Sequence, residues 1–391
     1  MPGFDYSRFD RLDCSDSEGE GDGGAGPAAL PKAEGKAALA ELPQDLPPGL
    51  SLVLAARQGH EHIVEALLDD GAPVDSADPH GATALLRAAE GGIANRKVIE
   101  LLLRRRASVE ARSESGEAPL TCAAAAGPAE LLECMLEAGS PSADVRGKAL
   151  AAAAKTGNRA TTQLLAASRA PASVEHAGRL PLNLWAEHGN VGVMQDILRL
   201  RADVNSCDEQ GTVPLASAVK SGSASAVRWL CQQGAHVDWH ASDGRTALVS
   251  AVETAGDACV EDVVGALLEH GAAPESVATE GFGVCAPSPM VAAAAAGRLG
   301  VARLLLAGRA DPGAADLAGR RPLPSAAVAG AGAVCRLLLE AGADANGRGT
   351  SGARGVPSGP GATALAVAAA TGDVRLAEML LERRADPEAE D

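Results

Sequence analysis

Two short motifs have residue types and spacings that could do chemistry. Gly347 to Gly352 reads GRGTSG and matches the GxGxxG pattern of dinucleotide-binding loops, but it neither follows a strand pattern nor opens a helix pattern, which favours a flexible inserted loop. Cys231, His236 and His240 have zinc-ligating side chains in a C-x4-H-x3-H spacing, but no fourth ligand is near in sequence. No GxSxG, HExxH or Walker motif is present. We therefore expect no enzyme, no cofactor and no metal site.

Residues 1–48 are predicted to be a disordered acidic tail that ends in a proline-rich linker, because low hydrophobicity and high charge leave little area to bury. Three aromatic residues lie near its start, at Phe4, Tyr6 and Phe9. The stretch FDYSRFDRLDCSDSEGE resembles the aromatic-then-acidic N-terminus of the kinase-specific heat-shock co-chaperone, and the resemblance implies a short docking motif. A solubilising tail is the other interpretation.

Ser15 and Ser17 lie in the acidic part of this tail. Each has a glutamate three residues later, which is the pattern of an acidophilic, casein-kinase-II-type site. Phosphorylation would add about −1.5 to −2 charge at each serine. Both serines are therefore candidate modification sites, although short matches of this kind also arise by chance.

The rest of the chain is built from one recurring unit. A clear copy is VCRLLLEAGADAN, from Val334 to Asn346, in which helix-spaced apolar residues run into Gly342 and a polar turn. Glycine just past the last periodic residue ends a helix, because it adopts the left-handed conformation without strain. Ten copies recur between Ala72 and Ala385, about 35 residues apart, and a shorter, alanine-rich helix precedes the longer one.

The helix-ending position holds glycine in half of the copies and arginine in the other half. The glycines are Gly71, Gly139, Gly234, Gly271 and Gly342, and the arginines are Arg106, Arg169, Arg201, Arg309 and Arg384. A non-glycine residue costs about 1 kcal/mol in the left-handed region. We expect the arginine copies either to end differently or to be slightly weaker.

A turn, a short small-residue helix and a longer leucine-rich helix together resemble the ankyrin repeat. The resemblance rests on starts such as VPLASAVKSG, from Val213, and on endings of the form L-L-x-x-G-A-D-x-N. It implies an all-α, ankyrin-type helical repeat solenoid over residues 49–391, with short β-hairpin turns. It also implies that Asn205 and Asn346 are candidates for asparaginyl hydroxylation, with a turn-stabilising role as the alternative.

One position departs from the ankyrin pattern, in which a histidine usually follows T-P-L and hydrogen-bonds the turn and the neighbouring repeat. Here that position holds Leu86, Thr121, Asn183, Ala216, Val249, Val291, Pro324 and Ala366. The missing histidine predicts a less rigid array.

Composition limits the possible functions. Apolar residues make up 46% and aromatic residues only 2%, so the interior must be alanine, leucine and valine. A net charge of −17 argues against nucleic-acid or anionic-membrane binding and favours a basic partner. The sequence contains no run of 18 apolar residues, so we expect no membrane-spanning helix. None of the eight cysteines forms a CxxC pair, which is typical of reduced thiols in a cytoplasmic, or alternatively nuclear, protein.

The function that fits best is a monomeric, non-catalytic scaffold that binds a protein partner on the concave face of the array. Contacts implied by the family lie at the turn tips: Asp75, Asp78, His80, Asp208, Glu209, Asp238, Trp239, His240 and Asp243. Trp239 is the strongest candidate, because a large apolar side chain on a turn is a typical hot spot, and packing beneath the hairpin is its alternative. A chaperone- or kinase-linked adaptor, recruiting through the N-terminal aromatic-acidic motif, is the alternative function.

The terminal repeats should present polar outer faces, because they close the stack. Gln58, His60, Glu61 and His62 would serve at the first repeat. The acidic ending RRADPEAED would serve at the last.

Overall fold

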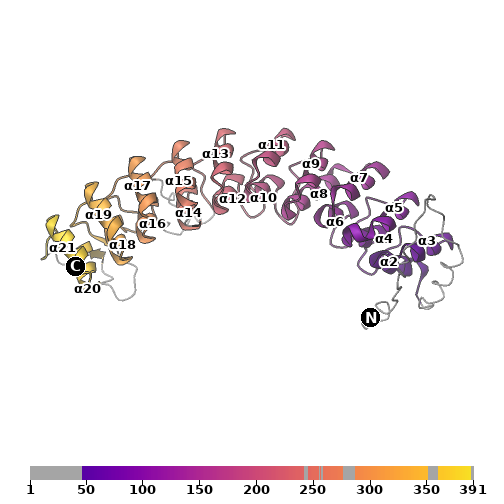
Figure 1. Ribbon diagram of the computed structural model, residues 1–391, viewed down its shortest axis with the longest axis horizontal. Coiled ribbons are helices and arrows are strands. Elements are labelled where there is room, and N and C mark those ends of the chain that lie inside the picture. Colours follow the sequence, from indigo (N-terminus) through magenta and orange to yellow (C-terminus); the bar gives the residue numbers. More distant parts are fainter. Residues whose placement is uncertain are drawn as a thin grey trace, which may run out of the picture.

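The computed structural model describes residues 46–241, 245–254, 256, 259–275, 287–350 and 360–388. In this part of the chain, twenty α-helices form ten pairs that stack side by side into an arch (Figure 1). The first helix of each pair lines the concave side of the arch, and the second lies on the convex side. The ten copies in the sequence are therefore ten helix pairs, and the predicted all-α solenoid is confirmed.

Each pair consists of an inner and an outer helix. In chain order they are α2 (Pro48–Gln58) and α3 (Glu61–Asp69), α4 (Ala84–Glu90) and α5 (Arg96–Arg104), α6 (Pro119–Ala126) and α7 (Ala129–Ala138), α8 (Ala143–Thr156) and α9 (Arg159–Ala167), α10 (Pro181–Glu187) and α11 (Val191–Arg199), α12 (Pro214–Lys220) and α13 (Ala224–Gln232), α14 (Ala247–Thr254) and α15 (Val260–Glu269), α16 (Pro289–Ala295) and α17 (Leu299–Ala307), α18 (Pro322–Val328) and α19 (Gly332–Glu340), and α20 (Ala364–Thr371) and α21 (Val374–Glu382). Within the described ranges, none of these helices combines the length and the apolar character that crossing a bilayer requires.

The inner helices begin at residues that favour a helix start. Pro119, Pro181 and Pro214 occupy the first turn of α6, α10 and α12, where a backbone N–H is not needed. In α4 and α20, the hydroxyls of Thr83 and Thr363 accept a hydrogen bond from the backbone three residues later. These starts fix where the alanine-rich stretches become helical.

Both glycine and arginine end the outer helices in the left-handed conformation. Gly71, Gly234, Gly271 and Gly342 have φ between 88° and 94°. The arginine positions adopt the same region, with φ of 62°, 57°, 63°, 69° and 64° at Arg106, Arg169, Arg201, Arg309 and Arg384. The arginine repeats therefore do not end differently, and the cost of that conformation to a residue with a Cβ remains.

Gly139 does not adopt the predicted left-handed cap. Its φ is −149°, so the chain leaves α7 in an extended conformation. Ser142 then starts α8 by accepting a hydrogen bond from the backbone N–H of Val145. Helix α8 has 14 residues and takes the place of the hairpin turn that precedes α4, α6 or α10. The row of hairpin tips is therefore interrupted between the third and fourth repeats.

The core is a row of small and aliphatic side chains between successive pairs. Inner helices pack against the next inner helix, and outer helices against the next outer helix. Alanines such as Ala88, Ala153 and Ala326 are fully buried, and leucines such as Leu102 and Leu338 fill the space between the outer helices. Because alanine allows close approach and costs no side-chain entropy on burial, a chain with few aromatics can still close this interior.

Two insertions interrupt the regular pairs, and the second contains the inserted loop predicted at Gly347 to Gly352. A 3-10 helix, η2 (Gly92–Asn95), joins α4 to α5, and the Asn95 amide donates to the carbonyl oxygen of Ala56 in the preceding repeat at 3.3 Å. Strands β1 (Gly349–Thr350) and β2 (Pro360–Ala362) pair antiparallel between α19 and α20. The GRGTSG motif therefore runs into a strand, whereas a dinucleotide-binding loop leads from a strand into a helix.

The two ends of the arch differ. At the first repeat, Glu61 and His62 are exposed, and neither α2 nor α3 exposes a large apolar side chain, as predicted for a closing repeat. At the last repeat, α21 exposes 66% of Val374 and 49% of Leu381. The prediction of a polar closing face at this end is wrong, because the polar stretch from Arg383 lies in the turn beyond α21.

Candidate interaction surface

One exposed position recurs near the C-terminal end of every inner helix, and the inner helices lie along the concave side of the arch (Figure 1). We call its ten residues the concave row: Arg57, Glu90, Ala125, Lys155, Glu187, Lys220, Glu253, Ala295, Val328 and Ala370. All are exposed except the half-buried Val328. The buried positions are small or aliphatic in repeat after repeat, whereas the concave row changes its chemistry from one repeat to the next.

The concave row has a charged and an uncharged part. In the first seven repeats, six of the seven positions carry a charge, and the sign alternates from Lys155 to Glu253. The last three repeats place Ala295, Val328 and Ala370 there. The two parts of the same surface therefore suit different chemistry in a bound molecule.

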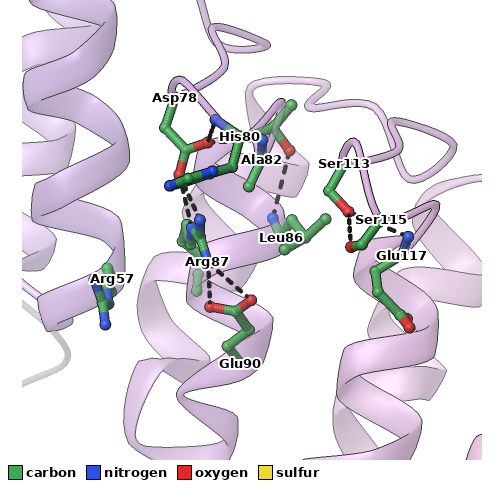
Figure 2. A network of polar contacts seen from close by, with 12 residues as sticks. Arg57, Asp78, His80, Ala82, Leu86, Arg87, Glu90, Ser113, Ser115 and Glu117 are labelled. Atoms are coloured by element: carbon green, nitrogen blue, oxygen red, sulfur yellow. Dashed lines mark hydrogen bonds and ion pairs between the residues drawn. The ribbon is translucent and has the colours of Figure 1, made fainter. Parts of the chain in front are cut away.

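Arg87 links a hairpin tip to the concave row in the second repeat. Its Nη2 lies 2.6 Å from Asp78 Oδ2, and its Nη1 lies 3.0 Å from Glu90 Oε2 (Figure 2). Burial alone would raise the pKa of Asp78, but hydrogen bonds from Arg87 and from the N–H groups of Ala82 and His80 outweigh it, so the pKa is lowered. The charged carboxylate of Asp78 is therefore already engaged in hydrogen bonds within its own repeat.

In two further repeats an arginine of the hairpin turn contacts the glutamate of the concave row. Arg179 Nη2 lies 3.0 Å from Glu187 Oε2, and Arg245 Nη1 lies 2.9 Å from Glu253 Oε2. Each glutamate of the concave row therefore has an arginine beside it, although Arg87 is shared with Asp78 and Arg179 with Asp208. Lys155 and Lys220, in contrast, have no ion pair among the described residues. The centre of the concave row consequently offers cations, although the whole chain is acidic.

Asp208 is a buried turn residue. Its Oδ1 accepts hydrogen bonds from the N–H groups of Gln210 at 3.1 Å and Thr212 at 2.9 Å. Its Oδ2 lies 2.9 Å from Arg179 Nε, and the side chain is 0% exposed. This burial corrects the expectation that the Asp208 carboxylate faces a partner. The neighbouring Glu209 is exposed.

The residue that ends each turn unit often binds the next repeat. Asp75 Oδ1 accepts from the N–H of Ser108 at 2.8 Å, and Asp238 Oδ1 accepts from the N–H of Ala273 at 3.0 Å. Both carboxylates are exposed despite these bonds. They hold neighbouring repeats together and can still meet solvent.

Asn205 and Asn346 occupy the same position and stabilise turns. Asn205 Oδ1 accepts from the N–H of His236 at 2.8 Å, and its Nδ2 donates to the Gly234 carbonyl oxygen at 3.1 Å. Asn346 Oδ1 accepts from the N–H of Asp386 at 2.7 Å. The turn-stabilising interpretation agrees with these contacts, and hydroxylation stays a prediction.

Asn183 stands where the ankyrin pattern has histidine, and it also hydrogen-bonds the neighbouring repeat. Its Nδ2 donates to the Thr212 carbonyl oxygen at 2.6 Å and to Asp208 Oδ2 at 3.1 Å, both in the next repeat. At the corresponding places in α4 and α14, Leu86 and Val249 are buried and apolar. The array is therefore tied by a polar bond here and by apolar packing at those two repeats.

The remaining predicted contacts are divided between exposed and packed positions. His80 and Glu209 are exposed at hairpin tips. Trp239 and His240 are half-buried, and Trp239 packs against the core, which favours its alternative role beneath the hairpin. Phe4, Tyr6, Phe9, Ser15, Ser17 and Asp243 lie outside the described residues.

Sequence reasoning missed the residues that define this surface. The sequence did not single out Lys155 and Lys220, nor Arg87 and Arg179, which pair with acids beside them. A signal was available, because a charged residue near the end of an alanine-rich helix has no reason to be there for packing. These charged residues can be recognised as equivalent positions of successive repeats only once the helix ends are known.

The described cysteines do not form a reactive or metal-binding centre. Cys231 is half-buried in α13, His236 is exposed in the following turn, and within the described ranges no group of three or more His, Cys, Asp or Glu residues is placed to hold a metal ion. Burial raises the pKa of Cys122 and Cys335 to about 12 and that of Cys231 to about 11.

We expect alkylation of the folded chain at pH 8 to separate the cysteines into two classes. Cys207 and Cys259 are exposed and should react first. Cys122, Cys231 and Cys335 should react far more slowly, because about one thiol in a thousand or fewer is ionised at that pH. A timed iodoacetamide pulse and peptide mapping would measure the rates, with the urea-unfolded chain as control. Equal rates at Cys335 and Cys207 before unfolding would contradict the burial.

The sequence matches the family model for ankyrin repeats in three segments, residues 49–113, 182–278 and 290–391, which together make up more than half of the chain. The long α8 lies in the first gap between them. A curated relative is the ankyrin repeat and KH domain-containing protein mask-1 of Caenorhabditis elegans, 26% identical over 225 residues, 57% of this chain and 8% of the relative. A second, CBG24701 of Caenorhabditis briggsae, is 27% identical over 190 residues, 48% of this chain and 7% of that protein. The chain spans less than a tenth of the length of these relatives.

Two solved structures are similar in part. The complex of the predatory endopeptidase Bd0816 from Bdellovibrio bacteriovorus with immunity protein Bd3460 matches with a TM-score of 0.42 and 25% identity over 51% of this chain and 96% of that one. The ankyrin repeat domain of Bcl-3, a member of the IkappaB family, matches with a TM-score of 0.48 and 25% identity over 60% of this chain and 97% of that one.

Proposed function

The chain belongs to the ankyrin repeat family, and we propose that it is a non-catalytic scaffold that binds a protein partner along the concave side of the arch. The concave row carries this proposal, because its side chains are exposed, take little part in packing, and differ between otherwise similar repeats. Free, buried thiols such as Cys335 favour a reducing compartment, the cytoplasm or nucleus, for this activity.

The charges of the concave row indicate the partner's chemistry. Arg57, Lys155 and Lys220 present cations, while each acid of the row already pairs with an arginine. We infer a partner segment with carboxylates over the central repeats and small apolar side chains over the last three. This differs from the basic partner that the net charge favours, because the acidic residues that set the net charge lie largely at turns and outer helix positions.

Reversing the two central lysines should weaken partner binding. We expect the Lys155→Glu, Lys220→Glu double variant to bind a partner isolated on the immobilised full chain about tenfold or more weakly, because two attractive contacts become repulsive. The partner would be identified by mass spectrometry and its affinity measured by calorimetry.

The matched control reverses two arginines on the convex side. Arg303→Glu, Arg336→Glu makes the same change of net charge on exposed residues of α17 and α19, and it should leave the affinity within about twofold. Equal weakening by both double variants would mean that net charge, and not the concave row, governs binding. Trp239→Ala is a less sharp test, because Trp239 also packs against the core.

The alternative function, an adaptor that recruits through Phe4, Tyr6 and Phe9, predicts a different outcome. Deleting residues 1–25 would remove the partner, and the lysine reversal would have no effect. Under the scaffold proposal the deletion leaves the partner bound. The deletion and the lysine reversal together assign the binding segment.

A further inference from the structure

Helix α8 differs from the other inner helices at its start. It has 14 residues, whereas α2 has 11 and α4 has 7, and its first turns stand in the place of a hairpin. Ser142 accepts a hydrogen bond from the N–H of Val145 and so begins this helix before the position at which α10 and α12 begin. The fourth repeat therefore presents helical residues where the fifth and sixth repeats have a turn.

Lys148 is a charged residue at a position that the next two repeats bury. Counted back from the concave row, it corresponds to Leu180 before α10 and Val213 before α12, which are 5% and 6% exposed. The side chain of Lys148 is 31% exposed. Packing gives no reason for a lysine there, so its charge is available for another role.

Lys148 and Lys155 lie on the same face of α8. They are seven residues apart, nearly two helical turns, so their side chains leave the helix on the same side, about 10 Å apart. Residues 149–154 between them are alanines and one leucine, so no acid separates the two ammonium groups. The two lysines form a cationic pair that extends the concave row along α8.

Lys148 shares the acid beside it with an arginine. Its Nζ lies 3.6 Å from Asp144 Oδ2, and the same oxygen accepts a hydrogen bond from Arg112 Nη2 at 2.8 Å. Within the described part of the chain, Asp144 is the one acid at ion-pair distance from Lys148. Because one carboxylate faces two cations, the charge of Lys148 is not fully compensated and can attract a further carboxylate.

We propose that Lys148 is an additional binding residue of the concave site, and that an acidic loop of the partner contacts Lys148, Lys155 and Lys220 together. This inference rests on the proposed function, because it extends the same site. Complementary charge identifies the occupant as a carboxylate-bearing segment of the partner.

The positions of the three lysines determine the shape of that segment. Lys155 and Lys220 are two repeats apart, roughly 16–20 Å when neighbouring helices are packed at 8–10 Å. Lys148 lies about 10 Å from Lys155 along α8, in a direction that crosses the row. A straight strand along the row would miss Lys148, whereas a loop that bends at the fourth repeat reaches all three.

Binding of a fluorescent poly-L-glutamate to the full chain tests this inference. With a probe of about 20 residues at low salt, where charge contacts are least screened, anisotropy would report the affinity. We expect Lys148→Glu to weaken binding about fivefold or more, as Lys155→Glu does, because an attractive contact becomes repulsive. Lys148→Gln removes the charge without reversing it and should weaken binding less.

Lys97 provides the matched control. It also lies beside an acid, with its Nζ 3.8 Å from Glu61 Oε2, but it belongs to the outer helix α5. Lys97→Glu makes the same change of net charge and should leave the affinity within about twofold. Equal weakening by Lys97→Glu and Lys148→Glu would overturn the inference, because net charge would then explain both. Circular dichroism would verify that each variant is folded.

Acetylation of the lysines in the unaltered chain gives a readout that does not depend on any variant. Bound poly-L-glutamate should slow the acetylation of Lys148, Lys155 and Lys220 several-fold and leave Lys97 unchanged, as measured by peptide mass spectrometry. Protection of Lys155 and Lys220 without Lys148 would overturn this inference and leave the proposed function standing. Protection of none of the three would mean that the concave cations bind no carboxylates, and both proposals would fail.

Discussion

Replacing Asp208 with alanine is expected to lower the free energy of unfolding by about 3 kcal/mol. The substitution removes a fully buried carboxylate that lies 2.9 Å from Arg179 Nε and accepts from the N–H groups of Gln210 and Thr212. Arg179 Nε and the N–H of Thr212, both on half-buried residues, then lose this acceptor, and the Asn183 amide loses one of its two. Leaving one member of a buried pair alone costs more than the pair itself contributes.

Urea titration followed by tryptophan fluorescence would measure the loss, because Trp185 is buried on α10, beside this cluster. The neighbouring exposed acid supplies the control, and Glu209→Ala should change the free energy by less than about 0.5 kcal/mol. Asp208→Asn keeps an oxygen for the turn and should fall between the two. If Asp208→Ala proves as neutral as Glu209→Ala, the buried cluster does not stabilise the fifth and sixth repeats.

Asp208 and Glu209 also show where the sequence stops being informative. Both are acidic residues of one turn and look equivalent in the repeat pattern. The direction of each side chain depends on the turn's backbone, which periodicity does not reveal, so one is buried and the other exposed. The helices themselves could be predicted, since their apolar spacing and their glycine and proline signals are local.

Departures from the repeat arise from competition between neighbouring signals. Gly139 looks like its counterparts, but Pro141 follows it and Ser142 can cap a new helix, so the chain extends and α8 grows by displacing a turn. The polar residues that follow Leu381 likewise look, in the sequence alone, like a polar face that closes the stack. In three dimensions they lie beyond the helix, and the stacking face stays apolar. The concave row was missed for the same reason, because it is defined by the ends of helices on neighbouring repeats.

Replacing all five left-handed arginines with glycine is expected to raise the free energy of unfolding by roughly 3 kcal/mol. Arg106, Arg169, Arg201, Arg309 and Arg384 have φ between 57° and 69°, a conformation that costs a residue with a Cβ about 1–2 kcal/mol. Glycine removes that cost, and its greater freedom in the unfolded chain takes back about 0.5–1 kcal/mol. None of these side chains forms a hydrogen bond or ion pair in the described part of the chain, so little is lost.

The gains should add, because the positions belong to different repeats and share no contacts. Each single variant is expected to contribute a few tenths to about 1 kcal/mol, and urea titration would measure both the singles and the combined variant. The control is the same substitution inside a helix: Arg336→Gly in α19 should destabilise by about 1 kcal/mol, because glycine is a poor helix former there. If the five-fold variant is no more stable than the parent, the arginine repeats do not hold strain at their helix ends. The free energy of unfolding would then not depend on whether glycine or arginine ends the helix, and the expectation that the arginine repeats are weaker would be wrong.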